Sequence, residues 1–194
     1  MEVGKHNQST MGKLRPALKS LTSEEISERE KIAHMIAAAR RIDGKLKANK
    51  HGIENSLSSA YLYKNASILY KKGLENQCTR VAYNEDSYHI LLKSELAALN
   101  NAMVRAGHEA TSTTMLDLNA QVYGRSAQIH YALGQSSEEK EALKKARSAY
   151  AEMAKRQKHN LFSSPQRMDS HAQIEVKIVL IDTRLRQLEK SMRN

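Results

Sequence analysis

The strongest constraint on this chain is the long run of helix-forming residues between its two prolines, Pro16 and Pro165. Ala, Leu, Lys, Glu, Arg, Gln and Met fill long unbroken stretches, and these residues have high intrinsic helix propensities. An all-β fold would need more turns and more aromatic and β-branched residues, but the chain has no Trp and one Phe. The sequence therefore predicts an all-α fold.

Helix caps and apolar periodicity divide the chain into about six helices. Thr22 and Glu25 form a T-x-x-E capping box at the start of the first helix, which ends between Gly44 and Gly52. Residues 74–85 are either a short helix or a connector. The other five helices are predicted at about 53–72, 86–106, 113–133, 136–158 and 165–192.

Glycines and a second capping box mark further helix ends. Gly73, Gly107 and Gly134 each follow a predicted helix and are expected to end it as C′ residues. Ser136 and Glu139 repeat the capping-box spacing at the start of the fifth helix. Residues 1–20 lack periodicity and are predicted to be a flexible basic tail. Residues 21–194 are predicted to form a single helical domain.

A short pattern occurs twice in the chain. "ASILYKKG" at 66–73 and "AQIHYALG" at 127–134 share Ala, Ile, Tyr and Gly at the same positions. On a helix the Ala, Tyr and Gly lie on one face, and the Ile points about 200° away from it. Apolar groups on two faces predict that both helices are packed on two sides, as in a stack of helical hairpins.

Residues 118–150 resemble a tetratricopeptide repeat. Ala127, Gly134, Leu143 and Ala146 fall near the small, Gly, large and small positions of that family. The chain departs from the family at Glu139, which stands where the family has Ala, and it lacks the Trp and Pro positions. The resemblance implies stacked helical hairpins, and an irregular helical bundle is the alternative.

No motif for catalysis, a cofactor or a metal is present in the sequence. The eight histidines are scattered, and no pair has metal-ligand spacing supported by carboxylates or thiols. The chain is therefore not expected to be an enzyme. The single cysteine, Cys78, cannot form an intrachain disulfide, which favours a reducing compartment. The absence of a secretory signal and of a membrane-spanning run favours an intracellular, cytoplasmic location.

The formal net charge is +10, and Lys and Arg are in excess near both ends of the chain. Such a distribution suits contact with a polyanion, an anionic membrane or an acidic protein. Solvated helix faces would explain the same charges. The candidate polyanion-binding residues are Arg40, Arg41, Lys45, Lys47 and Lys50 near the end of the first helix, and Lys144, Lys145, Arg147, Lys155, Arg156 and Lys158 on the fifth.

The last helix carries an apolar seam with spacing typical of a helix–helix interface. "IEVKIVLI" alone alternates like a strand, but the heptad spacing continues to the end of the segment and favours a helix. The seam is expected to pack either on the first helix or on the same helix of a second molecule. Its residues are Ile174, Ile178, Ile181, Leu185, Leu188 and Met192.

These patterns predict a non-enzymatic helical protein-interaction module, which could be an adaptor, a scaffold or an assembly subunit. Its expected partner is another protein, with a homo-oligomer through the C-terminal helix as one form. Two alternatives stay open. One is a sequence-independent nucleic-acid-binding protein that contacts phosphates through its basic ends. The other is a peripheral membrane or coat-like protein whose basic ends contact anionic lipid.

Overall fold

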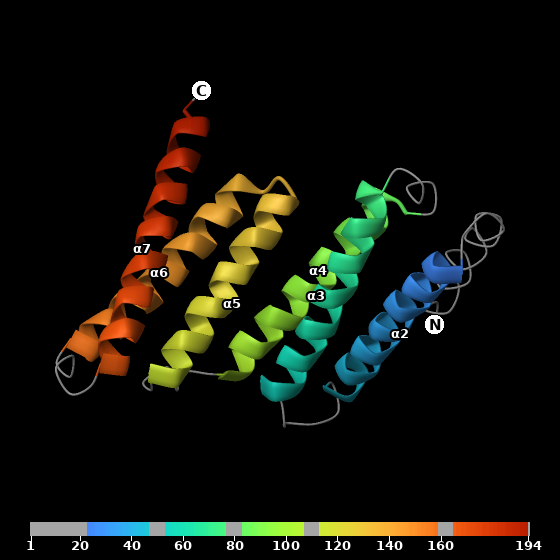
Figure 1. Ribbon diagram of the computed structural model, residues 1–194, viewed down its shortest axis with the longest axis horizontal. Helices are drawn as coiled ribbons and strands as arrows, with labels where there is room; N and C mark the ends of the chain where they lie inside the picture. The colour runs from blue at the N-terminus through green and yellow to red at the C-terminus, as the bar shows by residue number, and fades with distance from the viewer. Residues whose placement is uncertain (1–22, 47–52, 77–82, 107–112, 159–164, 194) are drawn as a thin grey trace. The chain divides into compact units, whose positions relative to one another are not determined.

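The computed structural model describes residues 23–46, 53–76, 83–106, 113–158 and 165–193, and this part of the chain is all-α (Figure 1). It contains no strand, and "IEVKIVLI" lies within the last helix, so the predicted fold class is confirmed. None of the described helices is long and apolar enough to cross a membrane. The helices are α2 (Ser23–Leu46), α3 (Ile53–Glu75), α4 (Glu85–Ala106), α5 (Thr113–Ala132), α6 (Ser136–Lys158) and α7 (Pro165–Ser191).

The helices fall into two compact units, Met1–Ala98 and Leu99–Asn194, and the division lies within α4. In the first unit α2 packs on α3, and in the second α6 packs on both α5 and α7. The predicted tail at residues 1–20 and the predicted cap formed by Thr22 and Glu25 lie outside the described side chains. The single domain predicted for residues 21–194 stays a prediction.

Small and hydroxylated side chains bring α2 and α3 together. The buried residues of α3 are mainly Ser and Ala, with Tyr63 as the one large side chain among them, and α2 packs on this helix. Asp43 of α2 accepts hydrogen bonds from the Ser59 hydroxyl at 2.6 Å and from the Tyr63 hydroxyl at 2.9 Å. Burial raises the pKa of Tyr63 to about 12, and the hydrogen bond to Asp43 contributes to the rise.

The prediction that Gly73 ends its helix is wrong. α3 continues to Glu75, and Gly73 is buried within it against Tyr83. A Cβ atom at Gly73 would lie 2.5 Å from the Tyr83 ring, so glycine is needed for close approach and not for a turn. The Tyr83 ring also packs edge-on against Tyr70, with ring centroids 4.8 Å apart. Asn84 follows and caps α4, because its side-chain oxygen accepts the Ser87 backbone N–H at 2.7 Å.

The prediction for Gly134 is confirmed. Gly134 has a φ of 70°, and its N–H donates to the Tyr131 carbonyl at 3.0 Å. The N–H of Gln135 donates to the His130 carbonyl at 2.9 Å, which completes a Schellman motif at the end of α5. The predicted end at Gly107 lies outside the described residues.

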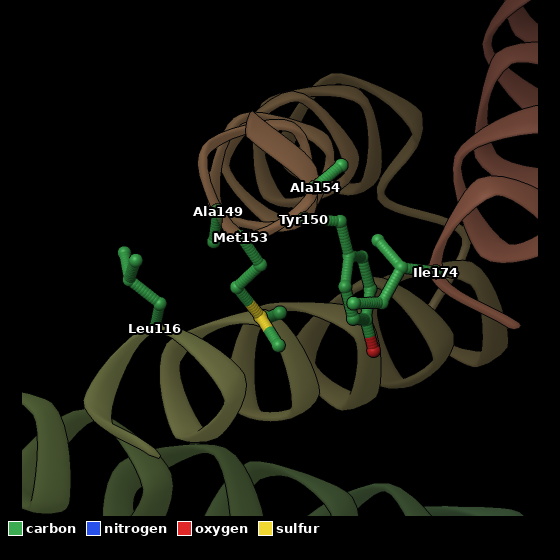
Figure 2. Packing of buried hydrophobic residues seen from close by; sticks show 7 residues of the cluster. Leu116, Ala149, Tyr150, Met153, Ala154 and Ile174 are labelled. Carbon is green, nitrogen blue, oxygen red and sulfur yellow. The ribbon is translucent and has the colours of Figure 1, made fainter. Parts of the chain in front are cut away.

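The apolar core of the second unit consists of two clusters, and each has residues from α5, α6 and α7. Figure 2 shows Tyr150 and Met153 extending from α6, with Ile174 of α7 beside the Tyr150 ring. Farther along, Leu143 of α6 packs in a second cluster with Ala127 of α5 and with α7. Because α6 packs on both α5 and α7, it is the central helix of this packing.

The two copies of the repeated pattern have different surroundings. Ala66 and Ala127 are both buried, but Ile68 is 51% exposed and Ile129 only 1%. α5 is therefore buried on two faces as predicted, whereas the Ile68 face of α3 meets solvent. The prediction that both helices are packed on two sides is wrong for α3. The same residues at the same spacing do not determine which other helices pack against them.

Candidate interaction surfaces

The inner face of α7 uses most of the predicted seam within the chain. Ile174 and Leu188 are buried, and Ile178, Ile181 and Leu185 pack at the margins of the two core clusters. Their partners are on α6 and α5, so the expectation that the first helix receives the seam is wrong. The remaining seam residue, Met192, is mostly exposed at the end of the helix.

Two bidentate ion pairs fix α7 against α6. Arg184 of α7 binds both carboxylate oxygens of Glu139, at 2.7 and 3.2 Å. Glu139 is 5% exposed and does not form the capping box predicted for it, because its carboxylate is turned to α7. The hydrogen bonds to Glu139 raise the pKa of Arg184 above its usual value. Arg184 also lies over the Tyr131 ring, 4.6 Å from the centroid.

The second ion pair joins Arg147 of α6 to Asp182 of α7 through two hydrogen bonds, at 2.5 and 3.2 Å. The hydrogen bonds from Arg147 lower the pKa of Asp182, and they raise that of Arg147. A third contact, between Lys140 and Glu189 at 3.2 Å, lies nearer the C-terminal end of α7. The partners in the two bidentate pairs are 35 and 45 residues apart in the sequence. The spacing of charges along the chain therefore could not predict these pairs.

Most of the candidate polyanion-binding residues on α6 have partners in their own chain. Lys144 contacts Glu141 at 2.8 Å, and Arg156 contacts Glu152 at 2.8 Å. These contacts lower the pKa of both glutamates. Arg147 is held by Asp182, and Lys145 lies over the Tyr123 ring. Lys155 is exposed, whereas the side chain of Lys158 lies outside the described part.

The candidate polyanion-binding residues on α2, unlike most of those on α6, are not paired with carboxylates of the described part. Arg40, Arg41 and Lys45 are all exposed, and they form no ion pair with any other residue whose side chain the structure describes. Arg41 and Lys45 are four positions apart, so they lie on the same face, pointing away from α3. Lys47 and Lys50, predicted to belong to the same cluster, lie outside the described residues.

The outer face of α7 is a surface that the sequence reasoning missed. We use this name for the exposed stripe on the side opposite the seam. Its core is Val176, Val179 and Leu180, which are 58%, 61% and 64% exposed. The segment "IEVKIVLI" already indicated this surface, because it has more apolar residues than the seam on one face of the helix includes. The members of the stripe are Ala172, Val176, Val179, Leu180 and Thr183.

Chemical features of an active site are sparse in the described part of the chain. Among these residues no group of three or more His, Cys, Asp and Glu side chains could hold a metal ion. A shallow hollow on α3 is lined by Leu57, Ser58, Tyr61 and Leu62, which provide an apolar surface with two hydroxyl groups. Cys78 lies outside the described residues.

Comparison of the chain with protein-family models, curated proteins and solved structures found no match. The tetratricopeptide resemblance therefore stays a prediction. The two surfaces on α7 and α2 are the features from which a function can be argued.

Proposed function

We propose that this protein is a non-enzymatic interaction module that docks another protein on the outer face of α7. The observation that carries the proposal is the exposure of Val176, Val179 and Leu180 on adjacent turns of one helix. Burying such a side chain completely is worth about 1.5–3 kcal/mol. Contiguous apolar surface left in water is typical of a protein-binding site, whereas isolated exposed apolar residues are not informative.

The packing of α7 supports this proposal. Its inner face is already occupied by α5 and α6, so the outer face is not needed to complete the core. The Arg184–Glu139 and Arg147–Asp182 pairs hold the helix in one orientation. A surface held rigidly before binding loses less conformational entropy when a partner docks.

Capture from native lysate with purified full-length protein as bait tests the proposal. Leu180→Lys places a charge in the centre of the outer face. Val104→Lys is the matched control, because Val104 is an exposed valine on α4. A bound protein should persist at high salt and after nuclease treatment, be lost with Leu180→Lys, and be retained with Val104→Lys. Equal capture by all three baits would refute docking on this face.

A second candidate function is polyanion binding through α2. The observation that favours it is the exposure of Arg40, Arg41 and Lys45 without a carboxylate partner among the described residues. Cations that are not already paired can contact phosphates without first breaking an internal contact. Such binding would be independent of sequence, because phosphate contacts position a protein without reading the bases.

A further inference from the structure

From the charges that continue the outer face of α7, we infer that its partner is an amphipathic helix with acidic residues at one end. This inference rests on the proposed function and names the kind of partner for the same face. Beyond Thr183 the same side of α7 carries Arg186 and Lys190, which are both exposed. We call these two residues the basic end of α7. A complementary partner has apolar residues opposite the outer face and carboxylates opposite the basic end.

Helix geometry places the basic end in line with the outer face. The residues of this line are 4, 3, 4, 3 and 4 positions apart, and they are Ala172, Val176, Val179, Thr183, Arg186 and Lys190. The line is about 27 Å long and changes from apolar to basic along its length. Alternating spacings of four and three are those of a helix side that packs along a second helix. The spacing therefore favours a helix as the docked element.

Acidic side chains that could neutralise the basic end are used inside the chain. Asp182, one turn before Arg186, has both carboxylate oxygens hydrogen-bonded to Arg147. Glu189, next to Lys190, contacts a lysine of α6 at 3.2 Å. Arg186 and Lys190 themselves form no ion pair with any other side chain that the structure describes. Their charges are therefore available to the carboxylates of a partner.

The cations beside the apolar part of the line are engaged by α6. Lys177 lies over the Tyr150 ring, 5.0 Å from its centroid. Arg184 binds the buried carboxylate of Glu139 through two hydrogen bonds. Glu175, which is exposed in the same part of the helix, adds a negative charge there. The positive charge available to a partner is thus concentrated at the basic end.

This lengthwise separation favours a protein helix over a membrane or a nucleic acid. A helix that lies on an anionic membrane has Lys and Arg on the polar side of its apolar face, where they meet the lipid headgroups. In α7 the exposed Glu175 would instead be repelled by anionic lipid. A nucleic acid would contact the basic end but would leave Val176, Val179 and Leu180 in water. A helix with apolar and acidic residues in the matching order satisfies both parts of the line.

Defined peptides test the inference with the purified full-length protein. The acidic probe is a labelled helical peptide that has leucines at heptad spacing over one half and glutamates at the same spacing over the other. The basic probe has lysines in place of the glutamates. The mixed probe has the composition of the acidic probe, with leucine and glutamate alternating along the line. Fluorescence anisotropy should show the acidic probe binding about tenfold or more tightly than either of the other two.

Reversing the charges of the basic end should reverse the preference between the probes. Arg186→Glu/Lys190→Glu should bind the basic probe more tightly than the acidic one, because the variant attracts lysines and repels glutamates. A gain of binding of this kind cannot come from a misfolded chain. The matched control Lys93→Glu/Lys155→Glu makes the same change in net charge at exposed lysines of α4 and α6, and it should keep the wild-type preference.

The apolar part of the line is tested separately. Leu180→Lys should weaken binding of the acidic probe about tenfold or more, because a charge then opposes the leucines of the peptide. Val104→Lys should leave this binding unchanged, since Val104 is exposed on α4. Equal weakening by the two substitutions would show that the peptide does not dock on the outer face of α7, and would overturn the inference.

The failures of the two proposals differ. Failure of the acidic probe to bind, or equal binding of the acidic probe and either of the other two, overturns the inference. A preference that persists in Arg186→Glu/Lys190→Glu also overturns it. Sedimentation of the protein with anionic vesicles that is lost in this variant assigns the basic end to lipid and has the same consequence. In each case the proposed function survives if capture from lysate still depends on Leu180, and it is refuted if that dependence is absent.

Discussion

At the scale of single residues, Gly73 illustrates how a glycine can be required for packing within a helix. Alanine favours a helix over glycine by up to about 1 kcal/mol. At Gly73, however, the added Cβ would collide with the Tyr83 ring at 2.5 Å, and overpacking of this kind costs about 1–3 kcal/mol. Gly73→Ala should therefore lower the free energy of unfolding in urea.

Gly124→Ala is the matched control, because a Cβ at that position in α5 meets nothing within 4 Å. It should stabilise the protein by about 0.5–1 kcal/mol. If both substitutions stabilise, the contact between Gly73 and Tyr83 does not constrain the fold.

Tyr63 should make the stability of the protein dependent on alkaline pH. An unfolded tyrosine titrates near 10, and burial raises the pKa of Tyr63 to about 12. A raised pKa means that the folded state retains the proton longer, so the contribution is fully present below pH 10 and is lost as pH rises toward 12. The loss is on the order of 2–3 kcal/mol.

Tyr63→Phe removes both the titrating group and the hydrogen bond to Asp43. The variant should be less stable than the wild type near neutral pH, by about 1 kcal/mol. That difference should shrink and then change sign between pH 10 and 12 in denaturant titrations, because the wild type loses more stability over this range than the variant lacks at neutral pH. Tyr61→Phe on the same helix changes an exposed tyrosine, so a similar pH dependence there would contradict the assignment to Tyr63.

At the scale of helices, the Arg184–Glu139 ion pair between α6 and α7 has one buried and one partly exposed partner. Substitutions of the two partners should therefore lower the free energy of unfolding by different amounts. Glu139 is 5% exposed, whereas Arg184 is 35% exposed and can reach water. Arg184→Met leaves the buried carboxylate of Glu139 without its ion-pair partner and should lower the free energy of unfolding by about 3 kcal/mol. Glu139→Gln leaves an oxygen acceptor beside a partly solvated guanidinium and should cost only about 1 kcal/mol.

Urea denaturation of the two variants checks this asymmetry. The double variant Glu139→Leu/Arg184→Met should recover much of the loss, since apolar groups can replace a buried pair with little net change. Equal costs for the two single variants would contradict the unequal burial of the partners.

The two faces of α7 provide a second prediction at this scale. Leu188 is buried against α6, and Leu180 on the outer face is mostly exposed. Leu188→Ala should lower the free energy of unfolding by about 2–5 kcal/mol, and Leu180→Ala by less than about 0.5 kcal/mol. Both are measured in dilute protein, where self-association does not contribute. Similar losses would mean that the helix is packed on both sides.

The sequence predicted the helices well because their signals are local. The periodicity of Ile174 and its neighbours identified the inner face of α7, and Gly134 identified the end of α5. The prediction for Gly73 was wrong because the sequence alone does not distinguish a glycine that ends a helix from a glycine that makes room for an aromatic ring. The partner of the seam was missed for a related reason: heptad spacing defines an apolar face but not the helix that covers it.

At the scale of the whole molecule, the net charge of +10 overstates the number of cations that can contact a partner. The sequence placed the α6 and α2 cations in one class of candidates. In the structure the Arg147 and Arg156 side chains are engaged by carboxylates of their own chain, whereas Arg41 and Lys45 are exposed. Pairing across distant helices depends on tertiary packing, so counting charges along the chain could not separate the two groups.

If α2 binds a polyanion, reversing its outward charges should change both affinity and salt dependence. Each phosphate contact contributes about 0.9 to the slope of log affinity against log salt concentration for duplex DNA. Arg41→Glu/Lys45→Glu should therefore weaken binding to unrelated duplexes equally and reduce the slope by about 1.8. The control Lys93→Glu/Lys190→Glu makes the same change in net charge at exposed lysines on α4 and α7.

Filter binding at several salt concentrations measures both quantities, and sedimentation with anionic and neutral vesicles separates nucleic acid from lipid as the polyanion. Arg40 is left unchanged because its charge acts on Tyr63 in the contact with α3, so its reversal would mix stability with binding. If the α2 variant and its control lose affinity alike, binding follows net charge alone and α2 is not a site. If only the α2 variant loses affinity and slope, its outer face contacts phosphate directly.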